Sequence, residues 1–431
     1  MFPIPYFSLK SKRALEPSQI DHIGAKFVIA NPLMRYIIYP ALPDRLYIGY
    51  PAPLQEVDVS ALQKRAQLLL RESASRGSTG HSPSILSHNL LAAVADGSTE
   101  LIFLGTGSAC PAKFRNVTAN LLMIHPLPSS GKEDVAVNKE CNIVEGSWSL
   151  LLDVGEGTLG QLYRRYGLNL PAALRSLGCV HISHAHADHH MGLIYVLQER
   201  VKAWQEVSNN PVVPLLVIGP KFVQDWLSAY SDYFSLAYTF IDAECFVRQD
   251  AAPPAYLPPA LLHGGISDLR NVKVLHCTRA YGVVIQHTRG WKLVFSGDTR
   301  PCPALVEAGL GASVLIHEAT FDDEMKVDAD AKNHSTTGDA IAVGKAMNAG
   351  IVFLTHFSQR YPKIPIFDPS FAFNTAIAFD LMCVRFSDLP TLPQMLPALK
   401  VIFAAEYTGK EADEDNSSWK SVETDIGVCT P

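Results

Sequence analysis

One short segment of the chain, residues 184–190, contains four histidines and one aspartate. His184 and His186 are separated by one residue, so an extended backbone directs both imidazoles to the same side. Asp188 and His189 follow at the start of a segment with helical periodicity, DHHMGLIYVLQERVKAW. Imidazole and carboxylate ligands suit zinc and also accept manganese or iron. We therefore interpret this segment as one part of a metal site.

Further potential ligands follow apolar runs elsewhere in the sequence. His276 follows VKVL, Asp298 follows KLVFSG, His356 follows IVFLT, and SVLI is followed by His317 and Glu318. A single histidine in such a place is usually exposed, or buried and hydrogen-bonded. Several strand ends that carry a histidine or an acidic residue indicate a common site, because ligands bind beyond the carboxyl ends of strands in open α/β sheets.

Together these residues predict a centre with two metal ions. The ligands form two sets joined by one carboxylate: His184, His186 and His276 for the first ion, Asp188, His189 and His356 for the second, and Asp298 as the bridge. Two ions ~3.5–4 Å apart activate water and stabilise an in-line displacement. His190 is left over and is expected to be structural. His181 is expected to be buried or to support the ligands.

The elements that must position these ligands alternate between strands and helices. Apolar runs that stop at glycine or polar residues predict buried strands: TELIFLGTG, SLLLDVGEG, LGCVHIS, PLLVIGP, VKVLHC, GVVIQH, WKLVFSGDT, ASVLIHEAT and GIVFLTHFS. Helical segments are expected at 156–166, 220–233 and 335–349. This alternation predicts a layered α/β domain.

Residues 1–97 differ in composition from the rest of the chain. They combine short extended pieces interrupted by prolines with one helical segment and a small polar stretch, and we interpret them as an N-terminal linker or adaptor. The domain that carries the ligands is expected over 98–407, with an inserted loop at 125–148. Residues 408–431 form an acidic tail that we expect to be disordered.

The composition limits the classes of partner and compartment. The chain has 431 residues, of which 48% are hydrophobic and 18% charged, as in a typical globular protein. Its formal net charge is −6, so a nucleic-acid substrate would need a local basic surface. The eight cysteines form no C-x-x-C pair, and no apolar run reaches the ~18 residues of a membrane span. We expect no membrane association, reduced thiols and an intracellular location, in the nucleus, the cytoplasm or the mitochondrion.

The motifs around these ligands resemble those of the metallo-β-lactamase superfamily and, more specifically, of the tRNase Z family. SHAHADHHMG carries the superfamily signature, while LLLDVGEGTLGQL, FSGDTRPC, IHEATF, HSTTGDA and LTHFSQRY resemble stretches of tRNase Z. FLGTGSACPAKFRN contains the P-x-K-x-R-N loop of that family at Pro111, Lys113, Arg115 and Asn116. The resemblance covers about residues 98–406. FSQRYPKIPIF and FSDLPTLPQMLPALKVIFA are similar to the C-terminal, catalytic half of the long eukaryotic form.

The resemblance implies a fold, a reaction and a cofactor. The fold is an αββα sandwich, in which two mixed sheets are flanked by helices. The reaction is removal of the 3′ trailer of precursor tRNA, by hydrolysis of the phosphodiester after the discriminator base with a 3′-OH left on the tRNA. The cofactor is two Zn²⁺ per chain, with Mn²⁺ or Mg²⁺ as alternatives.

The resemblance also implies catalytic roles for individual residues. Asp188 would bind metal and accept a proton from the attacking water, which agrees with the short distance between a metal-bound carboxylate and a bound water. His334 would contact the scissile phosphate or protonate the leaving ribose oxygen, and Glu318 would orient that imidazole. Asp153 would support a histidine ligand.

RNA binding is expected to involve the P-x-K-x-R-N loop and a further chain. A basic pair in a loop grips phosphates, so Lys113 and Arg115, with Asn116, are expected to contact RNA. The N-terminal half, which carries an RNA-clamping arm in the long form, has no counterpart in this sequence. We therefore expect a homodimer, a separate clamp half or a partner protein to complete RNA binding. Glu406 stands where the long form has an aspartate.

Two alternative functions stay open. One is another metallo-β-lactamase hydrolase, such as a small-molecule phosphodiesterase or a thioesterase, against which the P-x-K-x-R-N and HST motifs argue. The other is a catalytic-domain fragment or non-catalytic paralogue that needs a partner to bind RNA. The intact set of metal ligands argues against loss of catalysis.

Overall fold

The computed structural model describes most of the chain between residues 88 and 395. The described residues are 35–36, 48–49, 88–112, 114–127, 143–207, 212–248, 256–359 and 374–395. Residues 3–68 form a separate unit, whose described part is a short antiparallel pair, β1 (Arg35–Tyr36) with β2 (Ile48–Gly49). Lys113, Glu406, most of 1–97 and all of 408–431 lie outside the described residues, so the domain limits stay predictions.

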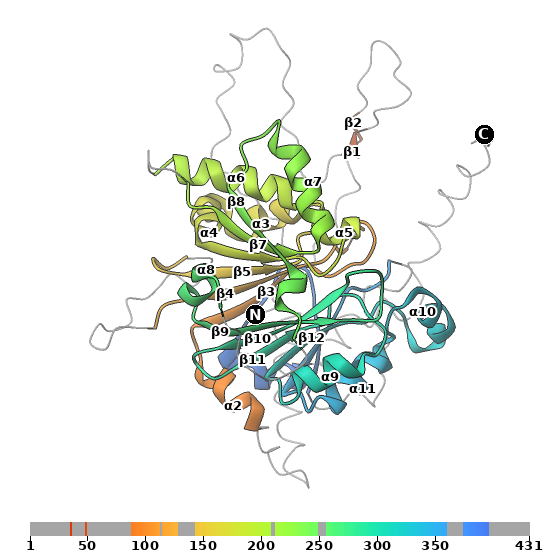
Figure 1. Ribbon diagram of the computed structural model, residues 1–431. Helices are drawn as coiled ribbons and strands as arrows, with labels where there is room; N and C mark the ends of the chain where they lie inside the picture. Colours follow the sequence, from red (N-terminus) through yellow and green to blue (C-terminus); the bar gives the residue numbers. More distant parts are fainter. Residues whose placement is uncertain are drawn as a thin grey trace, which may run out of the picture. The chain divides into compact units, whose positions relative to one another are not determined.

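Two mixed β-sheets form the framework of the larger unit (Figure 1). The seven-stranded sheet has the order β15-β3-β4-β5-β6-β7-β8, with strands Met382–Arg385, Thr99–Gly105, Ala119–Ile124, Trp148–Leu152, Leu177–His181, Leu215–Gly219 and Tyr238–Asp242. The six-stranded sheet has the order β14-β13-β12-β11-β10-β9, with strands Thr375–Ile377, Ile351–Thr355, Val314–Glu318, Lys292–Phe295, Tyr281–His287 and Ile266–Lys273.

Each sheet is antiparallel on one side and parallel on the other. Strands β15 to β5 pair antiparallel and β5 to β8 parallel, while β9 to β11 pair antiparallel and β11 to β14 parallel. Strands β5, β7 and β13 are buried along their whole length. Parallel strands covered on both faces read as continuous apolar runs, which is why the sequence predicted these strands.

Three apolar layers hold the sheets and helices together. The central layer joins the inner faces of the two sheets, where the rings of Phe103 and Phe353 lie 5.0 Å apart. The outer face of the seven-stranded sheet packs against α3 (Thr158–Tyr166), α4 (Leu170–Ser176), α6 (Leu193–Gln205) and α7 (Lys221–Ser231). The outer face of the six-stranded sheet packs against α9 (Pro303–Gly309) and α11 (Thr337–Ala346) (Figure 1). The expected αββα sandwich is confirmed.

The described residues form four further α-helices, and the three helices predicted from the sequence are present. Besides the packed helices, the chain forms α2 (His88–Ala95), α5 (Ala187–His190), α8 (Pro259–His263) and α10 (Lys326–Lys332). The helices predicted at 156–166, 220–233 and 335–349 correspond to α3, α7 and α11, with ends that differ by at most three residues. No helix in the described ranges is long and apolar enough to cross a membrane. The six cysteines of the same ranges are free thiols.

A buried carboxylate ties the beginning of β3 to the second sheet. Asp96 accepts hydrogen bonds from Thr99 Oγ1 (2.6 Å) and from Trp291 Nε1 (2.8 Å). It also pairs with Arg289 Nη1 (3.0 Å), whose guanidinium donates to the carbonyl of His125 (2.8 Å). Burial would raise the pKa of Asp96, but the hydrogen bonds and Arg289 outweigh burial and lower it below 3.8.

We expect Asp96→Asn to lower the free energy of unfolding by about 3 kcal/mol near neutral pH, because it removes one partner of a buried ion pair. Since the pKa of Asp96 is depressed in the folded state, this stabilisation is fully present above about pH 4 and is lost as the pH falls further. Urea unfolding at several pH values measures it.

The matched control is Asp225→Asn, on the exposed side of α7, which should change the free energy of unfolding by less than ~0.5 kcal/mol. A loss in Asp96→Asn that stays constant down to pH 3 would contradict the assigned role of the carboxylate.

Candidate metal centre

The histidine-rich segment leaves β6 extended and then forms one turn of helix. His186 has an extended backbone (φ −72°, ψ 145°) and precedes α5. The helix ends because Gly192 lies against the backbone of a neighbouring loop: a Cβ at Gly192 would lie 2.2 Å from the carbonyl oxygen of Gly155. The N–H of Gly192 donates to the carbonyl of Val154 (2.9 Å). The segment expected to be one helix is therefore divided into α5 and α6.

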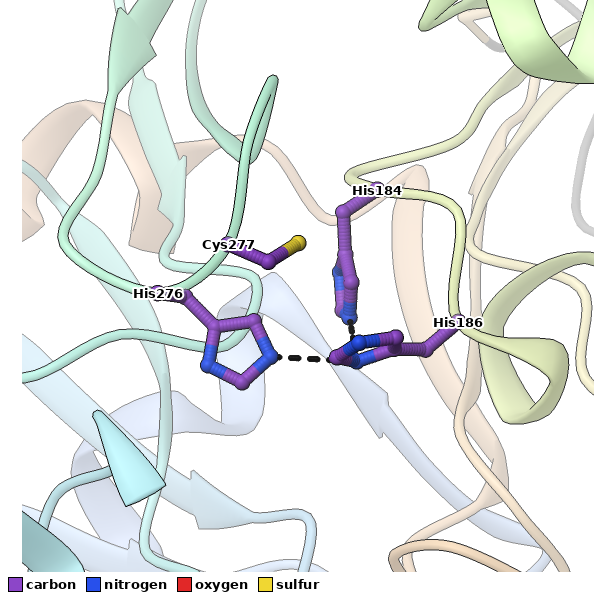
Figure 2. Close-up of side chains that lie close together, drawn as sticks. All are labelled: His184, His186, His276 and Cys277. Carbon is purple, nitrogen blue, oxygen red and sulfur yellow. Dashed lines mark hydrogen bonds between the residues drawn. The ribbon is translucent and has the colours of Figure 1, made fainter. Parts of the chain in front are cut away.

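Three histidines direct ring nitrogens at a common point (Figure 2). His184 Nε2 lies 2.9 Å from His186 Nδ1, which lies 3.1 Å from His276 Nε2. Zinc–nitrogen bonds of about 2.0–2.1 Å in a tetrahedral site place two ligand nitrogens roughly 3.3 Å apart. Burial lowers the pKa of all three imidazoles, which favours the neutral form that binds metals. The observed spacing thus suits one ion.

The local position of His276 differs from expectation. The sequence predicted that VKVL carries a strand up to His276, whereas β9 ends at Lys273. The histidine lies in the following turn, where its Nδ1 is 3.0 Å from the carbonyl of Asn333.

A second group consists of Asp188, His189 and His356. Asp188 Oδ2 lies 3.5 Å from His189 Nε2 and 3.4 Å from His356 Nε2. Both imidazole nitrogens are buried and have no hydrogen-bond partner among the described residues. A buried nitrogen without a partner carries a desolvation cost, which a bound cation would remove.

The carboxylate of Asp298 lies between the two groups. Its Oδ2 is 3.3 Å from His189 Nε2 and 3.7 Å from His184 Nε2. Its Oδ1 is 3.4 Å from His356 Nε2. Oδ2 therefore lies between the two groups and Oδ1 faces the second, a position from which this carboxylate could bridge two ions.

The charges of the centre favour a bound cation. Burial would lower the pKa of His189, but Asp298, Asp153 and Asp188 outweigh burial and raise it well above the usual range. Burial would likewise raise the pKa of Asp298, but His189 and His356 outweigh burial and lower it well below its usual range. Several carboxylates thus converge on one buried imidazole. A divalent ion would supply the positive charge that this imidazole otherwise takes up as a proton.

Hydrogen bonds fix the outer nitrogens of the second group. Asp153 Oδ2 lies 2.7 Å from His189 Nδ1, and its Oδ1 accepts from the N–H of Ser183 (2.7 Å). The hydroxyl of Thr320 lies 2.8 Å from His356 Nδ1. Partners of this kind hold the ring of a ligand histidine and raise its basicity. Asp153 therefore occupies the supporting position that the resemblance implied.

Backbone strain occurs at the same two places. Asp153 (φ 60°) and His356 (φ 61°) both adopt the left-handed region without being glycine. Such conformations cost of order 1–3 kcal/mol each and persist where the surroundings determine them. In this fold they direct a supporting carboxylate and a ligand imidazole into the centre.

An acid–base pair lies beside the ligands. His334 Nδ1 is 2.8 Å from Glu318 Oε1 and 4.0 Å from Asp298 Oδ2. Burial would lower the pKa of His334, but Glu318 and Asp298 outweigh burial and raise it to about 9. With Nδ1 engaged by Glu318, Nε2 of the protonated ring is left to donate a proton.

The structure encloses Arg115, contrary to the expected RNA contact. Its Nη1 donates to Thr106 Oγ1 (2.6 Å) and to the carbonyl of Ala378 (3.0 Å). The guanidinium lies over the ring of Phe357, 4.5 Å from its centroid. Burial lowers the pKa of Arg115 to about 10, still far above neutral pH. The guanidinium therefore holds the loop internally and does not face solvent where phosphates would approach.

The other two residues expected to contact RNA are placed differently. The backbone N–H of Asn116 donates to Asp380 Oδ2 (2.6 Å), and its side-chain nitrogen is buried without a hydrogen-bond partner. Asn116 thus also faces the protein interior. Lys113 lies outside the described residues.

Three further histidines lie near the centre without joining either ligand group. His190 Nδ1 lies 2.8 Å from the carbonyl of His186, and its ring packs edge-on against Trp226. His317 and His181 are fully buried. This agrees with the structural roles expected for His190 and His181.

Two side chains near the centre were not predicted from the sequence. The sulfur of Cys277 lies within 4.8 Å of the ligand nitrogens of His184, His186 and His276 (Figure 2). Thr320 connects His356 to Glu318 through its hydroxyl. Both follow predicted residues closely, Cys277 after His276 and Thr320 two positions after Glu318, and that proximity was the available signal.

Comparison with known proteins identifies related sequences and structures. Residues 149–357 match the β-lactamase superfamily domain. The chain is 43% identical over 314 residues to the human protein named zinc phosphodiesterase ELAC protein 2, a match that covers 71% of this chain and 36% of the human protein. It is 40% identical over 375 residues to the mitochondrial tRNase Z TRZ3 of Arabidopsis thaliana, across 76% of this chain and 40% of that protein.

A solved structure supports the same relationship. The long form RNase Z from yeast matches with a TM-score of 0.59 and 30% identity, over 73% of this chain and 44% of the yeast chain. The chain therefore spans less than half the length of these relatives.

We expect Asp153→Asn to weaken the binding of one metal ion by about 10- to 100-fold, because loss of a carboxylate behind a ligand histidine has that effect. Titration of the metal-free protein with zinc, in competition with a chromogenic chelator, measures the affinities. Asp96→Asn makes the same chemical change at a distant buried carboxylate. Equal zinc affinities in the two variants would contradict the supporting role of Asp153.

Proposed function

The chain carries a metallo-β-lactamase superfamily domain and is homologous to the tRNase Z proteins, and we propose that it is an endoribonuclease that removes the 3′ trailer of precursor tRNA. The bond cleaved would be the phosphodiester after the discriminator base, with a 3′-OH left on the tRNA. The proposal rests chiefly on the His334–Glu318 pair beside two ligand groups that share Asp298. An acid beside a paired cation site suits hydrolysis of a phosphodiester.

We propose that the centre holds two Zn²⁺, one in each ligand group. Nitrogen-rich donors in the first group favour zinc, and the added carboxylates of the second group also accept Mn²⁺ or Mg²⁺. Bound divalent ions would lower the pKa of water and neutralise charge on the phosphate.

Asp188 is proposed to accept the proton of the attacking water. Its Oδ2 accepts a hydrogen bond from the backbone N–H of Ala109 (2.7 Å), which fixes the plane of the carboxylate. The side chain keeps 11% of its surface exposed, enough to meet a water at the centre. A proton acceptor must lie within hydrogen-bond reach of its donor, and the partial exposure of Asp188 beside the ligand groups supports this role.

His334 is proposed to protonate the leaving ribose oxygen, with Glu318 as its positioning residue. Glu318 is buried and its second oxygen accepts from the hydroxyl of Thr320 (2.6 Å). The carboxylate therefore cannot turn away, and it holds both the orientation and the proton of His334. The side chain of His334 is 15% exposed, which leaves a path to substrate.

RNA binding is proposed to need more than this chain's catalytic centre. Arg115 and Asn116 face inward, and the net charge of −6 disfavours contact with phosphates over most of the surface. We propose that Lys113 contacts the RNA and that a second copy, a clamp half or a partner protein supplies the remaining grip.

Incubation of the purified chain with a 3′-extended precursor tRNA and zinc should give one cut, after the discriminator base. Mapping the product ends by gel electrophoresis locates the bond, and Asp188→Ala should abolish the cut. A tRNA bound but not cut, or a cut at scattered positions, would count against the proposed reaction. Cleavage only at high RNA concentration would indicate that this chain alone binds the RNA weakly.

We expect His334→Ala to lower kcat by about 10²- to 10⁴-fold, the usual contribution of a general acid. Glu318→Gln should cause a smaller loss of about 10-fold, because the imidazole remains but its orientation and charge are weakened. Single-turnover cleavage and elemental analysis should be measured together. A loss of bound metal in either variant would instead make these residues ligands.

A further inference from the structure

The turn between β14 and β15 places a carboxylate under the loop that begins at β3. Asp380 is partly buried, and its oxygens accept hydrogen bonds from both ends of this loop. Oδ1 accepts from the N–H (3.0 Å) and the hydroxyl (2.7 Å) of Thr106. Oδ2 accepts from the N–H of Asn116 (2.6 Å) and from Gln161 Nε2 (3.0 Å). One side chain thus fastens both ends of the 106–116 loop.

The surroundings show why a carboxylate is needed there. An ionised carboxylate is acceptor-only and can take all four of these donors. The amide of an asparagine has one acceptor oxygen and an NH₂ group, which would face a backbone N–H at one end of the loop. Burial raises the pKa of Asp380 to about 6, although the hydrogen bonds and Arg115 act to lower it. The carboxyl group is therefore mainly ionised near neutral pH.

The loop fastened by Asp380 contacts the two chain segments that carry the second group, the one with Asp188 and the one with His356. The N–H of Ala109 donates to Asp188 Oδ2 (2.7 Å). The carbonyl of Thr106 accepts from the N–H of Phe357 (2.8 Å), and the carbonyl of Phe357 accepts from Ser108 (3.1 Å). Phe357 directly follows His356 in the chain. Displacement of the loop would therefore move the hydrogen bond that orients Asp188 and the backbone that carries His356.

We propose that Asp380 is a positioning residue for hydrolysis: by fixing both ends of the 106–116 loop, it holds the Ala109 N–H against Asp188. The inference rests on the proposed function, in which Asp188 accepts the proton of water. Asp380 itself touches neither a ligand atom nor substrate. Its effect passes through the hydrogen bonds that hold the loop, so it should alter turnover more than affinity.

The experiment compares Asp380→Asn with Asp96→Asn in the full chain loaded with zinc. Both variants exchange a hydrogen-bonded carboxylate for an amide, but Asp96 fastens the sheets far from the loop. Turnover of bis(4-nitrophenyl) phosphate and of a precursor tRNA, hydrogen exchange of the 106–112 amides, and bound zinc are measured for each. Misplacement of about 1 Å can cost 10²-fold in rate, so a kcat loss of about 10-fold or more is expected.

The expected result has three parts. Asp380→Asn loses kcat at least about 10-fold with KM within about 2-fold and zinc retained, while its loop amides exchange faster. Asp96→Asn keeps kcat within about 2-fold and keeps slow exchange in the loop, although it unfolds at lower urea.

Equal kcat per folded protein in the two variants would overturn the inference, as would unchanged exchange at Ala109 in Asp380→Asn. If the wild-type chain turns over the small phosphodiester but not the tRNA, tRNA cleavage by the chain alone is ruled out while this inference is still decided by kcat. If it turns over neither, the exchange of the loop amides decides it.

Discussion

The concentration of negative charge around one buried imidazole is the constraint on which the rest of the structure depends. Asp153, Asp188 and Asp298 all face His189, which is almost fully enclosed. Such a cluster is costly in a protein interior unless a cation neutralises it. The nitrogens that the described residues leave without a partner, on His189 and His356, point to the same place. The fold must therefore assemble donors from distant parts of the chain with little freedom to move.

The αββα sandwich provides that rigidity by facing two similar sheets across one apolar layer. Each sheet carries ligands on loops that follow its parallel strands, β6 in one sheet and β11 and β13 in the other. Left-handed backbone at His356, after β13, and at Asp153, after β5, directs these two side chains into the centre. The hydrogen bonds of Thr320 and Asp380 then remove the remaining freedom of the loops. The geometry of the candidate metal centre is thus set by backbone and core, and the donor side chains only complete it.

Much of the fold, and the convergence of the candidate ligand side chains, could be predicted from the sequence because both leave local patterns. Buried parallel strands read as apolar runs, and histidines directly after them mark the site. Strand β8 is partly exposed and β14 has only three residues, so neither leaves such a pattern. Arg115 was assigned to RNA because a basic pair in a loop suits phosphate, yet nothing local reveals whether a guanidinium turns outward or inward. Asp380 was missed because its partners at 106, 116 and 161 are distant in sequence.

The spread of the ligands along the chain has a consequence for biosynthesis. The histidine-rich segment ends at residue 190, but the last donor, His356, follows β13, which pairs in parallel with β12 and β14. Because a chain emerges from the ribosome in order, the first donors are exposed to cellular metals long before the last can join them. An ion acquired early would be held by the first donors alone, outside its final geometry. The complete set of donors therefore exists only once β13 has joined the six-stranded sheet.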